Sequence, residues 1–300
     1  MSIRIKRDKY FYKFEPDLTP VAHVKPGNEI VFETHDCFHG QIRNENDLFA
    51  NLDWNHTNPA TGPVFIDGAT PNAVLRIDIL DVEVEEFSVM VTIPGESVVG
   101  DRITDMETTI LRREQNELIY KEKIRLPLAP MIGVIGVAPS EGSIGNGVPG
   151  FHGGNMDCIL IGKGSRLYLT VQVEGALLGI GDLHATMGDG EIVAVGAETA
   201  GVVRIIPEIV NLPNLPTPFL ENDEFVVTIF SDPDLNKAAD GAVHNMLDYL
   251  IKFVGLSIND ASMLMSAAGS LKVCQVVDPS KTARFEFPKA ILVQLGYSLS

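Results

Sequence analysis

Four ionisable residues lie close together in one short, glycine-rich segment, namely Asp182, His184, Asp189 and Glu191. Because glycine adopts positive φ at little cost, such a segment can turn several side chains toward one point. A histidine with carboxylates is a ligand set for a divalent metal of the zinc type, and a remaining carboxylate could transfer a proton. For Asp189 a plain β-turn is the alternative interpretation, because Asp-Gly pairs are common in hairpins.

A second glycine-rich segment carries Asn155 and Asp157, directly after Gly153 and Gly154. If the segment is extended, the two polar side chains lie on one face, because residues two apart share a face of a strand. They would then bind a metal or a substrate amide, or simply cap a turn. His152 precedes the glycines, and we interpret it as a surface loop residue.

A third polar cluster follows an expected strand that ends near residue 34. Asp36 lies where a ligand pocket could open at the end of that strand, which makes it a further candidate metal ligand. His35 and His39 are more typical of ordinary polar surface. Cys37 and Cys158 each follow a candidate aspartate, and we interpret both as buried, unreactive thiols.

The segments that must position these residues are mostly strands. Val74–Val84 alternates apolar and polar residues with one slip, which predicts a strand with one face on a core. Among 27 glycines and 18 prolines, further runs predict strands at 29–34, 88–93, 166–173, 191–195 and 202–206. Residues 1–206 are therefore predicted to form a mainly β, antiparallel sandwich or barrel-like core.

Residues 207–300 have a different pattern. Four prolines between 207 and 218 predict an extended crossover. Apolar residues then recur at helical spacing from Ala238 to Val254, after a helix start at Asp232 and Pro233. The other expected elements are a strand at 225–230, a helix from 257 to about 268, and strands at 272–277 and 283–287. We expect an α+β C-terminal part packed on the β-rich core.

Charge and composition exclude several kinds of partner. The chain has 23 Lys and Arg against 40 Asp and Glu, a net charge of −17, and this excess repels nucleic acid and anionic lipid. The longest apolar stretch, Leu126 to Ala138, is shorter than the roughly 20 residues that span a bilayer. Three dispersed cysteines and no apolar signal segment predict a cytoplasmic protein. The stripe at 238–254 suits a core or a subunit contact, and we expect a homo-oligomer.

Six motifs, taken together and in order, resemble the acetamidase/formamidase family. They are THDCFHGQI from Thr34, NPATGPVFIDGA from Asn58, GVIGVAP from Gly133, HGGNMD from His152, GDLHATMGDGEI from Gly181 and CQVVDP from Cys274. The resemblance implies a β-rich fold with an α+β C-terminal part, and hydrolysis of short linear amides such as formamide or acetamide. It also implies that the family's polar positions are Asp36, Asn155, Asp157, Asp182, His184, Asp189 and Glu191.

The main hypothesis is a metal-dependent amidase with a small amide as substrate. The metal, zinc in preference and calcium as the other option, is expected to bind Asp36, Asp157, Asp182 and His184. It would activate a water, while Glu191 or Asp189 moves the proton and Asn155 steadies the oxyanion. One alternative is a calcium-stabilised, small-ligand-binding protein of the same fold, since the ligand set is rich in oxygen. Another is hydrolysis of a different C–N bond, as in a cyclic imide.

Overall fold

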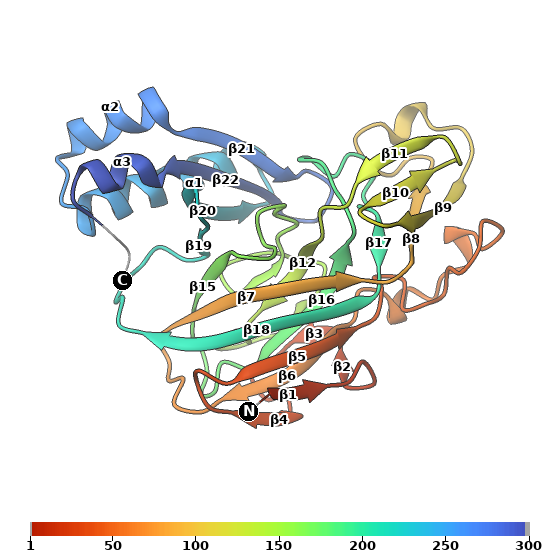
Figure 1. Ribbon diagram of the computed structural model, residues 1–300, viewed down its shortest axis with the longest axis horizontal. Coiled ribbons are helices and arrows are strands. Elements are labelled where there is room, and N and C mark those ends of the chain that lie inside the picture. Colours follow the sequence, from red (N-terminus) through yellow and green to blue (C-terminus); the bar gives the residue numbers. More distant parts are fainter. Residues whose placement is uncertain (1, 298–300) are drawn as a thin grey trace.

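The computed structural model describes residues 2–297, and two large sheets dominate it (Figure 1). The first sheet has nine strands, antiparallel except for the pairing of β1 with β5. Their order is β1 (Ser2–Ile5), β5 (Glu29–Thr34), β18 (Gly201–Val210), β7 (Val74–Val84), β15 (Arg166–Thr170), β19 (Phe219–Glu221), β20 (Phe225–Asp232), β22 (Lys281–Pro288) and β21 (Ser270–Gln275).

The second sheet contains the strands that carry most of the polar motifs. Its path is β11 (Ile124–Pro127), β10 (Glu117–Tyr120), β9 (Glu107–Glu114), β8 (Phe87–Thr92), β17 (Glu198–Thr199), β16 (Leu178–His184), β12 (Met131–Gly136) and β14 (Gly153–Asn155). Off this path, β6 (Ala60–Ile66) pairs with β16, and also with β2 (Tyr10–Phe11) and β4 (Ala22–Val24). Strands β3 (Lys13–Phe14) and β13 (Ile144–Gly145) form a separate pair.

One apolar core lies between the two sheets. Phe32 and Ile77 come from the first sheet, Ile132 and Ile180 from the second, and all four belong to a single cluster of buried side chains. Burying apolar area from both inner faces is the main contribution to stability in such a sandwich, at about 25 cal/mol per Å². The predicted mainly β fold with an antiparallel core is confirmed.

Three helices cover the C-terminal half of the first sheet, as Figure 1 shows: α1 (Leu235–Lys252), α2 (Ile258–Ala268) and α3 (Lys289–Gln294). The apolar stripe of α1 is largely buried within the chain, with Ala242 and Met246 in the core under β20 and β22. The homo-oligomer stays a prediction. Among residues 2–297, no helix is both long and apolar enough to cross a membrane.

Two local predictions near residue 200 were wrong. Residues 191–195 form turns rather than a strand, because Glu191 and Ala194 have φ of 48° and 65°, outside the range of extended backbone. The crossover does not begin at Pro207, since β18 continues to Val210. The Pro207 carbonyl accepts a hydrogen bond from Gly27 N, which precedes the first residue of β5. An N–H of residue 207 would point to the same side, beyond the pairing of β18 with β5, so the proline interrupts no ladder of hydrogen bonds.

The C-terminal part continues the first sheet. Strand β18 runs through the expected boundary at 206/207, and β19 to β22 extend the same nine-stranded sheet beyond β15. The first helix begins two residues later than expected, because Asp234 is its N-cap and accepts a hydrogen bond from Asn236 N at 2.8 Å. The division into residues 1–206 and 207–300 stays a prediction.

Candidate active site

The centre of the second sheet brings two of the polar segments together. Strand β12 pairs with β16 on one side and with β14 on the other, so that Val134 lies between Gly181 and Asn155. Asp182 and His184 belong to β16, and Asp157 follows β14 with φ of 46°. An aspartate can adopt this left-handed conformation more readily than a β-branched residue. The sheet pairing thus explains why segments 25 residues apart share one site.

His184 lies at the middle of the resulting cluster. Its Nε2 atom is 3.0 Å from Glu198 Oε1, 3.5 Å from Asp182 Oδ1 and 3.9 Å from Asp157 Oδ1. All four side chains are buried. On the other side of the ring, Nδ1 lies 3.2 Å from the Met187 sulfur. The imidazole is therefore held with Nε2 toward the carboxylates.

Several atoms of the cluster are buried without a hydrogen-bond partner. They are Asn155 Oδ1, both carboxylate oxygens of Asp157, Asp182 Oδ1, His184 Nε2, Glu191 Oε2 and Glu198 Oε2. His184 Nε2 is near Glu198 but lacks hydrogen-bond geometry to it. Each buried, unpaired polar group costs about 1–3 kcal/mol. So many in one place indicate a site that is completed by a bound group.

A cation fits these atoms. Two sets of three residues place one potential ligand atom each within 4.8 Å of the others: Asp157, His184 and Glu191, and beside them Cys37, Asp182 and Glu198. Carboxylate, imidazole and thiolate are all ligands of divalent metals. The buried His, Asp and Glu groups could therefore bind a metal.

The electrostatics of the cluster point the same way. Burial, together with the neighbouring carboxylates, raises the pKa of Asp157 well above its ordinary value. Burial also raises the pKa of Glu198 to about 7 and that of Asp278 to about 7. Burial by itself would lower the pKa of His184, but the carboxylates of Glu198 and Asp182 outweigh it and raise that pKa. A bound cation would reduce the repulsion among these buried carboxylates.

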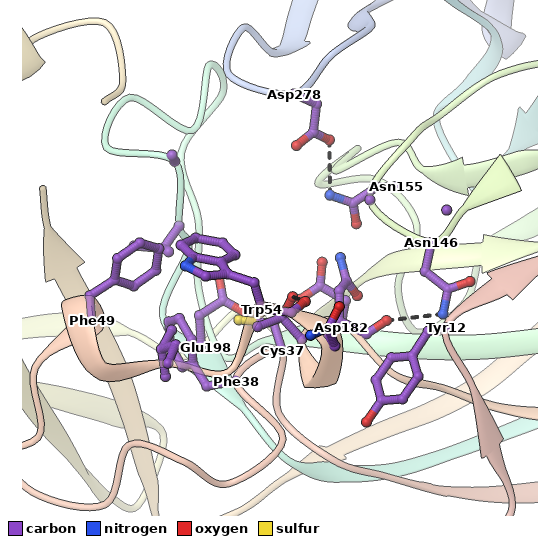
Figure 2. Close-up of a pocket in the computed structure, with 18 of the residues that line it drawn as sticks. Tyr12, Cys37, Phe38, Phe49, Trp54, Asn146, Asn155, Asp182, Glu198 and Asp278 are labelled. Carbon is purple, nitrogen blue, oxygen red and sulfur yellow. Dashed lines mark hydrogen bonds between the residues drawn. The ribbon is translucent and has the colours of Figure 1, made fainter. Parts of the chain in front are cut away.

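The cluster lies at the bottom of an open pocket of about 440 Å³ (Figure 2), with Asp157 and His184 buried behind the residues that line it. Asp182, Glu191 and Glu198 line it from the second sheet and the loop after it. Asn155 and Asp278 lie to one side, where Asn155 Nδ2 donates to Asp278 Oδ2 at 2.9 Å. A small molecule can therefore reach the carboxylates from solvent.

The structure brings five of the seven predicted site residues to this pocket or its floor: Asn155, Asp157, Asp182, His184 and Glu191. Asp36 is not in either metal-binding set; its Oδ1 atom accepts from Gly40 N at 2.9 Å and closes the turn after β5. Asp189 pairs with the buried Arg284, through contacts of 2.5 and 2.8 Å. The roles predicted for Asp36 and Asp189 stay predictions, and these contacts favour structural roles for both.

Sequence reasoning missed three residues of the pocket. Glu198 is the single charged residue in a run of small and apolar residues, and this pattern could have marked it as a candidate. The structure shows that it is buried, which is rare for a glutamate unless it is paired. Asp278 belongs to the CQVVDP motif but comes from the far C-terminal region, so only the fold shows its position. Cys37 lines the pocket, and burial raises the pKa of its thiol well above the ordinary value.

Comparison with known proteins decides the family. The model of the acetamidase/formamidase family matches residues 2–143 and 145–294. The chain belongs to this family. A solved acetamidase structure from Bacillus halodurans is 42% identical, with a TM-score of 0.97 over 98% of this chain and 100% of that one. A predicted acetamidase/formamidase from Thermoanaerobacter tengcongensis is 43% identical, with a TM-score of 0.96 over 100% of this chain and 99% of that one.

A more distant relative is matched over only part of its length. The formamidase of Methylophilus methylotrophus is 27% identical in a match that covers 64% of this chain and 62% of the relative. The match to this chain thus spans less than two thirds of that formamidase. The resemblance predicted from the six motifs is confirmed at the level of the family.

In this member of the family, Gly133 allows two carboxylates to approach each other. A Cβ atom there would lie 2.5 Å from Asp157 Oδ1 and 2.7 Å from Asp182 Oδ2, and real Cβ contacts are not that short. We expect Gly133→Ala to displace both carboxylates and to weaken divalent-metal binding by about 10–100-fold. Isothermal titration with zinc and with calcium measures the change.

Gly188→Ala is the matched control for that substitution, because a Cβ atom there meets nothing within 4 Å. It should bind metal as the wild type does. Equal affinity in Gly133→Ala, Gly188→Ala and the wild type would contradict the packing argument.

His152 is buried, contrary to the prediction of a surface loop residue, and burial lowers its pKa to about 4. In the unfolded chain it keeps a pKa near 6.5. Between these values the unfolded state binds more protons, so stability falls as the pH falls through this window. We expect this residue to lower the free energy of unfolding by about 2 kcal/mol from pH 7 to pH 5.

Urea unfolding at both pH values tests that effect, with His152→Asn as the comparison. The variant cannot titrate at this position and should lose stability less steeply with acid than the wild type. Parallel pH dependence of the two proteins would show that His152 keeps its ordinary pKa in the fold.

Proposed function

We propose that this chain hydrolyses short linear amides to a carboxylate and ammonia at the cluster around His184. The observation that carries the proposal is the convergence of unpaired, buried carboxylate and imidazole atoms on the floor of an open pocket. Family membership supports the same reaction, because the relatives named above include a formamidase and acetamidases.

Asp157, Asp182 and His184 are the residues that would hold a divalent metal. Asp157 and Asp182 belong to adjacent ligand sets, and Glu198 lies against His184 Nε2. Such a metal supplies Lewis-acid polarisation of the amide carbonyl and makes water more acidic. Amide resonance makes the carbonyl a poor electrophile, so this assistance addresses the main barrier to hydrolysis.

The other residues bind the amide and move protons. Glu191 is buried at the pocket floor with Oε2 unpaired, so it can take a proton from the attacking water and return it to the departing nitrogen. The second N–H of Asn155 Nδ2 is available to the developing oxyanion. Asp278 lines the same wall and can accept an N–H of the substrate amide. The overall reaction consumes one water and releases ammonia.

An ammonia-release assay with formamide, acetamide and propionamide tests the proposal, together with elemental analysis of the purified protein. Activity that rises with bound zinc and disappears on chelation is the expected result. Full activity in a demonstrably metal-free preparation would contradict the metal-dependent route. Turnover of none of these amides by metal-loaded protein would contradict hydrolysis of short linear amides.

A calcium-stabilised binding protein is the second candidate, and the oxygen-rich donor set favours it. Asp157, Asp182, Glu191 and Glu198 supply carboxylate oxygens, which calcium prefers, against one imidazole and the thiol of Cys37. In this case the same analysis should find calcium, with no ammonia released from any amide in the panel. A cyclic imide added to the panel tests for hydrolysis of a different C–N bond.

A further inference from the structure

The pocket is larger than formamide or acetamide requires. Its volume of about 440 Å³ lies in the range of roughly 300–1,000 Å³ that is typical of sites for drug-sized ligands. At about 30 Å³ for each water in the liquid, it would hold roughly 15 waters, whereas acetamide is the size of only a few. The space above the carboxylates can therefore hold a ligand larger than acetamide.

The two sides of the pocket differ in chemistry (Figure 2). Asn155 and Asp278 form a polar wall on one side. On the other, aromatic and aliphatic side chains form a continuous apolar wall that reaches from the rim to the floor beside Glu198 and Cys37; it consists of Phe38, Phe49, Leu52, Trp54 and Val195. We call this set the apolar wall.

The aromatic members of the apolar wall pack in an ordered way. Trp54 and Phe49 meet edge to face with ring centroids 4.8 Å apart, and Phe49 meets Phe38 at 6.2 Å. Phe38 is 3% exposed at the inner end, whereas Trp54 is 62% exposed at the rim. An exposed tryptophan at the mouth of a pocket leaves apolar area that a ligand can cover.

Hydrogen bonds hold the backbone turn that carries Trp54. It lies in a short 3₁₀ helix, Trp54–His56, whose N-cap Asp53 accepts from Asn55 N at 3.0 Å. The Gln41 side chain accepts from Asp53 N at 2.8 Å and donates to the carbonyls of Asp53 and His56. The indole is therefore presented by a braced turn, and Gln41 is a positioning residue.

We propose that the apolar wall binds the acyl substituent of the substrate, and that the natural substrates are primary amides with an aryl or branched apolar group. This inference rests on the proposed amide hydrolysis. With the carbonyl carbon over the cluster, the carbonyl oxygen faces Asn155 and the NH₂ group faces Asp278. The apolar group then lies against Phe49 and Trp54. The C–N bond breaks, water supplies the oxygen of the new carboxylate, and nitrogen leaves as ammonia.

Steady-state kinetics with phenylacetamide and acetamide provide the first test. We expect the KM of the wild type to be lower for phenylacetamide than for acetamide. Trp54→Ala should raise that KM by about 30-fold, which corresponds to about 2 kcal/mol, and should change the kinetics for acetamide less than about twofold. Trp54→Phe should restore much of the preference. Phe151→Ala removes an aromatic residue that is also exposed but does not line the pocket, and it should behave as the wild type.

Tryptophan fluorescence provides a second readout that does not depend on turnover, because Trp54 is the single tryptophan of the chain. In the His184→Ala variant, phenylacetamide should shift the emission to the blue in a saturable manner, and acetamide should not. This experiment separates the two proposals. A saturable shift in this variant, with no hydrolysis of any amide by the metal-loaded wild type, would support the apolar subsite while contradicting the proposed function.

Two outcomes would overturn the inference. The first is equal loss of activity on acetamide and phenylacetamide in Trp54→Ala, which would make the residue structural. The second is blue emission in the free protein that phenylacetamide leaves unchanged, together with a dimer or larger species that Trp54→Ala dissociates. The rim would then be a contact between copies of the chain.

Discussion

Loss of the bound metal together with loss of amide hydrolysis is the result we expect from His184→Ala. The ring is the nitrogen donor among the three residues proposed to hold the metal, and its Nε2 lies within 4 Å of the carboxylates of Asp157, Asp182 and Glu198. Its removal leaves a buried group of like charges without their basic neighbour. Loss of a residue that only hydrogen-bonds to a metal ligand usually lowers activity by about 10–100-fold. Because His184 is itself proposed as a ligand, we expect its loss to lower activity by more than about 100-fold. Elemental analysis and ammonia release measure the two effects.

His244→Ala is the matched control for that variant. His244 is exposed on α1, where its Nδ1 atom contacts the Asp240 carbonyl, and it does not line the pocket. It should keep both metal and activity. If His184→Ala hydrolysed amides at the wild-type rate, the cluster could not be the active site, whatever its metal content.

Among the substitutions proposed here, Arg284→Met should lower the free energy of unfolding the most. Arg284 is 1% exposed and binds both carboxylate oxygens of Asp189 through its two terminal nitrogens, while its Nε donates to Glu286 at 2.8 Å. Without the guanidinium, Asp189 loses its partner and Glu286 keeps only Lys272. Removing one partner of a buried ion pair costs about 3–5 kcal/mol. Urea unfolding measures it. Arg204→Met is the control, since its ion pair with Glu29 is exposed and is worth at most about 1 kcal/mol.

Asp189→Asn then distinguishes the two roles of this aspartate. If its main role is to pair with Arg284, the variant unfolds more easily and still binds metal. If it moves a proton in the reaction, stability stays near that of the wild type while kcat falls by about 10²-fold or more. The contacts with Arg284 lead us to expect the first result.

Local patterns were enough to predict several of the longer elements. The alternation in Val74–Val84 identified β7 with both of its ends, and the helical spacing after residue 235 identified α1 within about two residues. Both periods are properties of a single segment, because they reflect which side chains share one face of that segment. Strand β16, which carries Asp182 and His184, was not predicted, because its glycines favoured a turning segment.

Where the local pattern was ambiguous, the tertiary structure decided. The apolar run at 191–195 resembles a strand, but it forms turns that direct Glu191 toward the pocket floor. His152 follows a loop-like sequence, yet Phe14 packs against its ring in the core. In both segments, contacts with distant residues outweigh the local preference.

The amino-acid sequence by itself predicted several strands and two helices, the family, and the polar residues Asp157, Asp182 and His184 that the fold brings together. The tertiary structure decided that Glu198 and Asp278 join them, that Asp189 pairs with Arg284, and that an apolar wall faces the carboxylates. The physical reason is one of range. The periodicity that predicts a strand or helix lies within one segment. The partner of a buried charge comes from a distant segment, so it depends on how the two sheets pair and pack.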